Sequence, residues 1–157
     1  INADSLIKLL ETAGEDSLKI DILKNLVFYL KETDPKKMDA YIDQGIKLSR
    51  KTKNFSAEAD FYNLSATGNG EKGNYQKAIE YSLEALKLEE KTKDEQRISS
   101  TLINLGNLYQ DLGQFDISIE YLKKALSLCE KNNDHLCLAK TYNNLGNSAL
   151  KKGEKKL

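Results

Sequence analysis

The sequence predicts an all-α fold, an α-solenoid of antiparallel helix pairs with about eight helices. Three observations support this prediction. The 157 residues contain a single proline, Pro35, so little interrupts helix formation. The chain matches itself when it is shifted by 40 residues. Each 40-residue period contains two stretches whose apolar residues recur every three or four positions, which is the spacing of one face of a helix.

The self-match at the 40-residue offset is densest in the middle of the chain. The aligned pairs include Gly73 with Gly113, Tyr75 with Phe115, Ala85 with Ala125, and Asn104-Leu105-Gly106-Asn107 with Asn144-Leu145-Gly146-Asn147. Repeats of 20 to 50 residues are typical of stacked helical units that bury a continuous core between neighbours.

In chain order, we expect helices at 3–13, 16–32, 35–53, 55–70, 74–93, 95–112, 114–132 and 135–152. The first caps the stack, three pairs follow at about 16–53, 55–93 and 95–132, and the last is a half repeat. Proline suits the first turn of the helix that begins at Pro35. Gly68-Asn69-Gly70 predicts a weak, mobile end to the fourth helix. Since the sequence has no linker-like segment, residues 1–157 are predicted to form a single domain.

Small residues inside the predicted helices have a physical explanation. Glycine within a helix costs about 1 kcal/mol relative to alanine. We therefore expect Gly106 and Gly146 to lie where two helix backbones come close. Gly73 and Gly113 follow predicted helices and suit the left-handed conformation that ends a helix.

The repeat resembles the tetratricopeptide pattern. The matching features are Leu105-Gly106 in the first helix, Tyr109 three residues after that glycine, the Gly113-x-Phe115 turn, and Ala125 in the second helix. Unit 98–133 matches best, unit 57–93 departs at Ser65, where glycine is expected, and unit 18–53 is degenerate. The 40-residue period resembles the extended subclass found in kinesin light chains and bacterial signalling proteins. The resemblance implies a right-handed superhelix with a concave groove.

The resemblance also implies a binding surface. In related repeats with the Leu-Gly-Asn signature, asparagines face the groove and hydrogen-bond the backbone of an extended peptide, as amides can both donate and accept. The alternative is that these asparagines bond to neighbouring helices. Lys140 is included because it could meet a carboxylate. Ile103 occupies a position where the basic clamp of chaperone-binding relatives needs lysine. The candidate binding residues are Asn104, Asn107, Lys140, Asn143, Asn144 and Asn147.

Cys129, His135 and Cys137 cluster around one predicted turn. A structural zinc site normally needs four protein ligands, and only three candidates are present, so we predict no metal. We also predict no cofactor. A disulfide is geometrically possible, but the default expectation is two buried thiols that pack as small apolar groups.

The composition bears on the function class. Lys plus Arg and Asp plus Glu both number 24, which gives no electrostatic reason to expect nucleic acid or an anionic membrane as a partner. No apolar run reaches the length of about 18 residues that spans a bilayer. No catalytic constellation can be assembled. The sequence therefore favours a non-catalytic module that binds a peptide or partner domain.

Residues 3–11 and Asp34-Pro35-Lys36-Lys37 resemble the start of repeat regions ahead of bacterial sensor histidine kinases and transcription regulators. This resemblance implies a sensory segment of a larger signalling protein, periplasmic if it is of the sensor-kinase type and otherwise cytoplasmic. The start at Ile1 and the final half repeat suggest a fragment. We expect the outer face of the last helix to continue into further chain or to contact a second copy.

Overall fold

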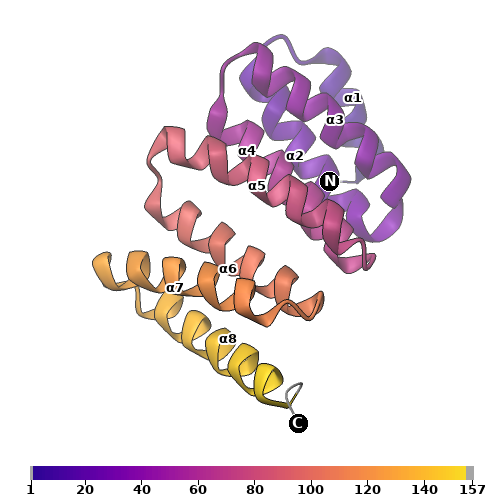
Figure 1. Ribbon diagram of the computed structural model, residues 1–157. Coiled ribbons are helices and arrows are strands. Elements are labelled where there is room, and N and C mark those ends of the chain that lie inside the picture. Colours follow the sequence, from indigo (N-terminus) through magenta and orange to yellow (C-terminus); the bar gives the residue numbers. More distant parts are fainter. Residues whose placement is uncertain (1, 155–157) are drawn as a thin grey trace.

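The computed structural model is a stack of antiparallel helices with α1 at one end and α8 at the other (Figure 1). It describes residues 2–154, without the side chains at positions 32 and 35, so positions 1 and 155–157 of the expected domain lie outside the described residues. The eight helices within that range are α1 Ala3–Thr12, α2 Asp16–Thr33, α3 Pro35–Lys51, α4 Phe55–Glu71, α5 Tyr75–Thr92, α6 Glu95–Asp111, α7 Phe115–Lys131 and α8 His135–Glu154. The all-α fold is confirmed. No described helix is long and apolar enough to cross a membrane.

The helices contact one another in chain order, and α2 also contacts α4 while α6 contacts α8. The backbones of α4 and α6 approach each other closely at fewer points than those of α2 and α4 or of α6 and α8. The even-numbered helices therefore form one layer that is more open in the middle, between α4 and α6, than at its two ends. This opening positions the candidate site described below.

The turns repeat with the same 40-residue period. Gly73 and Gly113, which follow α4 and α6, have φ angles of 77° and 70°, as the sequence predicts. The turns before α4, α6 and α8 contain a left-handed residue and then a capping side chain. The left-handed residues are Lys53, Lys93 and Asn133, and the caps are Asn54, Asp94 and Asp134, whose side-chain oxygens accept from the backbone N–H three residues later.

Glycine marks a close helix approach at Gly106 but not at Gly146. A Cβ atom added to Gly106 would lie 2.6 Å from Cγ of Leu122 on α7, and Leu122 is fully buried. The expectation is wrong for Gly146, because an added Cβ there would meet nothing within 4 Å. The reason is positional: among the described residues, no helix follows α8 to fill the place that α7 takes against α6.

The fourth helix ends one residue after the Gly68-Asn69-Gly70 segment, close to the expected end at 70. α4 continues to Glu71, and both glycines accommodate side chains from neighbouring helices. An added Cβ would lie 3.1 Å from Met38 Cε at Gly68 and 3.3 Å from Leu108 Cδ2 at Gly70. These contacts explain why the helix tolerates two glycines near its end.

A disulfide joins Cys129 to Cys137, so the expectation of two buried thiols is wrong. It links the last turn of α7 to the first turn of α8, with the Cα atoms 5.6 Å apart. The two helices are antiparallel and joined by a short turn, which brings residues on either side of the turn within bonding reach. Both cysteines are buried.

Candidate functional site

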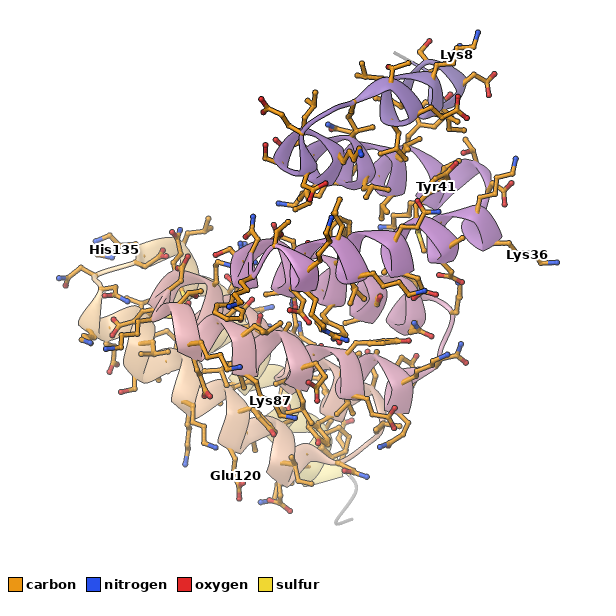
Figure 2. The ribbon with its side chains drawn as sticks, turned by 90° about the horizontal axis from the view of Figure 1, so that it is seen from above. Lys8, Lys36, Tyr41, Lys87, Glu120 and His135 are labelled. Carbon is orange, nitrogen blue, oxygen red and sulfur yellow. A yellow bond between two sulfur atoms is a disulfide. The ribbon has the colours of Figure 1, made fainter. Side chains whose placement is uncertain are left out.

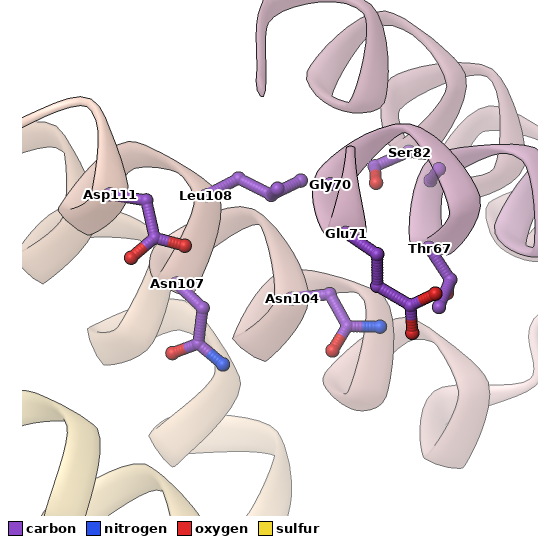
Figure 3. Close-up of a pocket in the computed structure, with 9 residues that line it drawn as sticks. Thr67, Gly70, Glu71, Ser82, Asn104, Asn107, Leu108 and Asp111 are labelled. Atoms are coloured by element: carbon purple, nitrogen blue, oxygen red, sulfur yellow. The ribbon is translucent and has the colours of Figure 1, made fainter. Parts of the chain in front are cut away.

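Two adjoining cavities lie between α4 and α6, and together we call them the α4–α6 groove. The first, of about 390 Å³, is lined by Ala66, Thr67, Gly70 and Glu71 of α4, Ser82 of α5, and Asn104, Asn107, Leu108 and Asp111 of α6 (Figure 3). The second, of about 310 Å³, is lined by Asp60 and Asn63 of α4, Glu89 of α5, and Gln96, Arg97, Ser100, Thr101 and Asn104 of α6. Asn104 borders both cavities, so they form one continuous surface.

Asn104 and Asn107 lie one turn apart on α6 and extend their amides into this groove, across from Thr67 and Glu71 of α4 (Figure 3). Asn104 is exposed and Asn107 half-buried. Within residues 2–154, neither side chain has a hydrogen-bond partner. In the described part of the chain, the donors and acceptors of both amides therefore make no hydrogen bond to neighbouring helices.

The other predicted site residues, all on α8, lie outside both cavities. The repeat offset places Asn144 and Asn147 at the positions of Asn104 and Asn107, and Lys140 at that of Ser100. Asn143 instead corresponds to Ile103, which packs in the core at 8% exposure. Asn143 therefore has no asparagine counterpart on α6, although it is exposed on α8 and lies one turn before Asn147.

Ion pairs cross the layer of even-numbered helices. Asp60 of α4 lies between Lys24 of α2, at 2.5 Å, and Arg97 of α6. Arg97 also donates to the backbone carbonyl of Ser56 at 3.1 Å. Glu71 pairs with Lys31 of α2 at 2.7 Å. These pairs hold α2, α4 and α6 together along the groove.

Glu89 is a buried carboxylate in the last turn of α5, and the sequence analysis did not single it out. It is 1% exposed. Its Oε1 accepts a hydrogen bond from Asn63 Nδ2 at 2.9 Å and lies 3.8 Å from Arg97 Nε. Burial raises the pKa of the Glu89 carboxyl, and the Thr101 hydroxyl, Asn63 and Arg97 only partly offset this effect.

A signal for Glu89 was present in the repeat. The 40-residue offset aligns Glu89 with Ser49 and Cys129, which are both buried. A carboxylate at a position that otherwise holds small side chains stands out. The same offset aligns the Glu89 and Arg97 pair with the disulfide-bonded Cys129 and Cys137, so the turn is tied by different chemistry in successive repeats.

The turn between α7 and α8 offers no metal centre in the described structure. His135 is exposed at the edge of the molecule (Figure 2). The sulfur atoms of Cys129 and Cys137 are bonded to each other and cannot serve as thiolate ligands. Over residues 2–154, no group of three or more His, Cys, Asp or Glu side chains is arranged to hold a metal ion.

Comparison with known families shows tetratricopeptide repeats in two segments of the chain. Family models described as tetratricopeptide repeat match residues 59–92 and 97–156. No curated protein matches the chain in sequence. The two N-terminal repeat units therefore differ: neither family model matches the degenerate unit 18–53, whereas unit 57–93 is matched over residues 59–92.

Solved structures with the same fold come from diverse proteins. A tetratricopeptide-repeat sensor protein of the signal transduction ATPase class from Pyrococcus horikoshii is 20% identical, with a TM-score of 0.83; the match covers 94% of this chain and 24% of that one. A putative kinesin light chain repeat protein from Podosopora anserina is 14% identical, with a TM-score of 0.77 and coverage of 98% and 79%. The N-terminal domain of stress-induced protein-1 from C. elegans is 18% identical, with a TM-score of 0.67 and coverage of 84% and 98%. The chain thus spans about a quarter of the first of these proteins.

Proposed function

Because this chain carries tetratricopeptide repeats, which are generally protein-interaction modules and non-catalytic scaffolds, we propose that it binds a peptide or partner domain in the α4–α6 groove. The observation that carries the proposal is the pair Asn104 and Asn107, whose amides line the groove without hydrogen-bond partners among the described residues. We treat the eight helices as one binding domain that acts as a scaffold and catalyses no reaction.

The proposed contact is with the backbone of an extended segment. Each asparagine amide offers an N–H donor and an oxygen acceptor, so it can bind a peptide group whatever side chains the peptide carries. Asn144, Asn147 and Lys140 continue the same repeat positions onto α8. A segment that leaves the α4–α6 groove toward α8 would meet them, and Lys140 would suit a carboxylate there.

The test uses amide-to-methyl substitutions on the groove and outside it. Peptides selected from a random dodecapeptide display library are synthesised, and their affinity is measured by fluorescence anisotropy. We expect Asn104→Ala with Asn107→Ala to weaken binding at least tenfold, since two hydrogen bonds of about 1 kcal/mol each are lost. Asn132→Ala, an exposed asparagine in the α7–α8 turn, is the control.

Two outcomes would contradict the proposal. One is that no peptide binds the folded chain. The other is that the double variant binds as well as the control while its circular dichroism shows intact helices. Asn143→Ala adds a finer test, because Asn143 corresponds to a buried position of α6 and its loss should matter less than that of Asn147 if the groove follows the repeat.

The outer face of α8 supports a second interaction, with another copy of the chain. Leu136 and Leu150 are 66% and 69% exposed. The repeat offset aligns them with Gln96 and Gln110, so packing within a repeat does not require leucine at these positions. We expect Leu136→Asp with Leu150→Asp to abolish association in sedimentation velocity. A wild-type chain that stays monomeric at the highest concentration tested would refute this part.

A sensory role within a larger signalling protein is the alternative function. It is supported by the resemblance of residues 3–11 and 34–37 to repeat regions of bacterial histidine kinases and regulators, and by the likeness to a tetratricopeptide-repeat sensor. Adjacent coding sequence decides it: a kinase or DNA-binding domain encoded in the same reading frame supports a sensory segment, and a chain made of repeats alone contradicts it.

A further inference from the structure

The α4–α6 groove contains a carboxylate oxygen whose hydrogen-bonding capacity is unused. Oε2 of Glu89 is buried and has no hydrogen-bond partner of good geometry among the described residues, although the Thr101 hydroxyl lies near the carboxyl; Oε1 accepts from Asn63. Buried polar groups in native proteins are nearly always paired, because an unpaired one keeps its full desolvation cost. Glu89 lines the smaller cavity, so a ligand there lies beside this carboxylate.

The repeat shows that the fold itself does not require this charge. Ser49 and Cys129 occupy the equivalent positions of the neighbouring repeats, and both are fully or almost fully buried without an ionisable carboxylate. The fold therefore accommodates a small neutral side chain at this position, although Oγ of Ser49 also lacks a hydrogen-bond partner among the described residues. The contacts of Glu89 with Asn63 and Arg97 involve Oε1, so they account for only one of its two buried oxygens.

Existing cations leave part of the groove charge unneutralised. The two cavities are lined by four carboxylates, of Asp60, Glu71, Glu89 and Asp111, and by one guanidinium, of Arg97. Lys24 and Lys31 of α2 pair with Asp60 and Glu71. Arg97 donates to Asp60 and to the Ser56 carbonyl, and it reaches Glu89 only at 3.8 Å.

We infer that the α4–α6 groove selects a segment bearing a lysine or arginine side chain, whose cationic end enters the smaller cavity and lies against the Glu89 carboxylate. The inference rests on the proposed peptide-binding function and names its ligand class. Asn104 borders both cavities, so its amide holds the backbone beside the inserted side chain. The cavity volume of about 310 Å³ accommodates an ammonium or guanidinium group together with bound water.

The test compares matched peptides on matched variants. Each selected dodecapeptide is synthesised with its lysine or arginine intact and with norleucine in that place, and both are titrated by fluorescence anisotropy. Glu89→Gln keeps the shape and the oxygen that Asn63 binds but removes the charge. Glu90→Gln removes an exposed charge next to it and serves as the control.

We expect Glu89→Gln to weaken the basic peptide by about tenfold to a hundredfold, the range for one hydrogen bond to a charged group, and to leave the norleucine peptide unchanged. Glu90→Gln should change neither. Peptides that bind through Asn104 but prefer acidic or neutral residues, or that ignore Glu89→Gln, would overturn this inference and leave the proposed groove intact. Absence of any peptide binding, or binding that is insensitive to Asn104→Ala with Asn107→Ala, would overturn both.

Discussion

The contact between Gly106 of α6 and Leu122 of α7 yields the sharpest quantitative prediction, because the chain contains its own control. Gly106 and Gly146 occupy the same place in successive Leu-Gly-Asn motifs. Both lie inside helices, and neither has a positive φ angle. Replacing glycine by alanine in a helix should stabilise the fold by about 1 kcal/mol when space is available. Space is available at Gly146, and we expect Gly146→Ala to show this gain.

At Gly106 the added methyl group would clash with the side chain of Leu122, which is closely packed. The added Cβ would lie 2.6 Å from Cγ and 2.8 Å from Cδ2 of Leu122, against an ordinary carbon contact of about 3.5 to 4.0 Å. Leu122 is fully buried, so relief requires the helices to shift. Such overpacking costs about 1 to 3 kcal/mol. We therefore expect Gly106→Ala to be less stable than Gly146→Ala by about 1 to 3 kcal/mol.

The assay is urea unfolding followed by circular dichroism at 222 nm, a wavelength that reports helix content. A double-mutant cycle with Leu122→Ala separates the steric contact from the helix propensity, because the cost of Gly106→Ala should shrink once the leucine is truncated. Equal stabilisation by Gly106→Ala and Gly146→Ala, or a cost that survives Leu122→Ala unchanged, would refute the reasoning from close packing.

Two further predictions concern links near the ends of α5 and α7. Reducing the disulfide between Cys129 and Cys137 should lower the thermal midpoint by an amount equivalent to at most about 2.5 kcal/mol, because the closed loop is short, with a sequence separation of 8. The variant with alanine at both positions is the control, and its midpoint should not change when reductant is added. A wild-type midpoint that does not change with reductant would contradict the presence of the disulfide. Burial raises the pKa of Glu89 in the folded chain, so its ionisation destabilises the fold as the pH rises through that value. Glu89→Gln should therefore gain stability relative to wild type in urea unfolding as the pH rises above 4.5, the ordinary pKa of this carboxyl, and a pH-independent difference would contradict this assignment.

Much of the fold is encoded locally and could be predicted from the sequence. Apolar spacing identifies the helices, although α3 ends at Lys51 before the expected 53 and α8 continues to Glu154 beyond the expected 152. Gly73 and Gly113 identify the turns because few other residues adopt the left-handed conformation easily. The left-handed conformation of Lys53 and Lys93 was not predicted, as lysine carries no such preference, yet both precede a capping Asn or Asp.

The site was predictable only in part. The repeated Leu-Gly-Asn motif identified Asn104 and Asn107, which line the groove, but helical spacing alone did not show that Asn143 occupies the position of buried Ile103. Glu89 was overlooked since an acidic residue near the end of a helix usually faces solvent. Its burial depends on two other helices. Asn63 of α4, 26 residues earlier in the chain, hydrogen-bonds it, and Arg97 of α6 lies near it.

By itself, the sequence determined the helices and the glycine turns after α4 and α6, because apolar spacing and turn residues act within one or two helical turns. It also determined the repeat period, because the chain aligns with itself at an offset of 40 residues. Tertiary structure alone decided that Cys129 and Cys137 are bonded, that Gly106 is packed while Gly146 is open, and that the layer of even-numbered helices opens between α4 and α6. These outcomes depend on the distance and angle between helices, which the packing of side chains far apart in the chain sets.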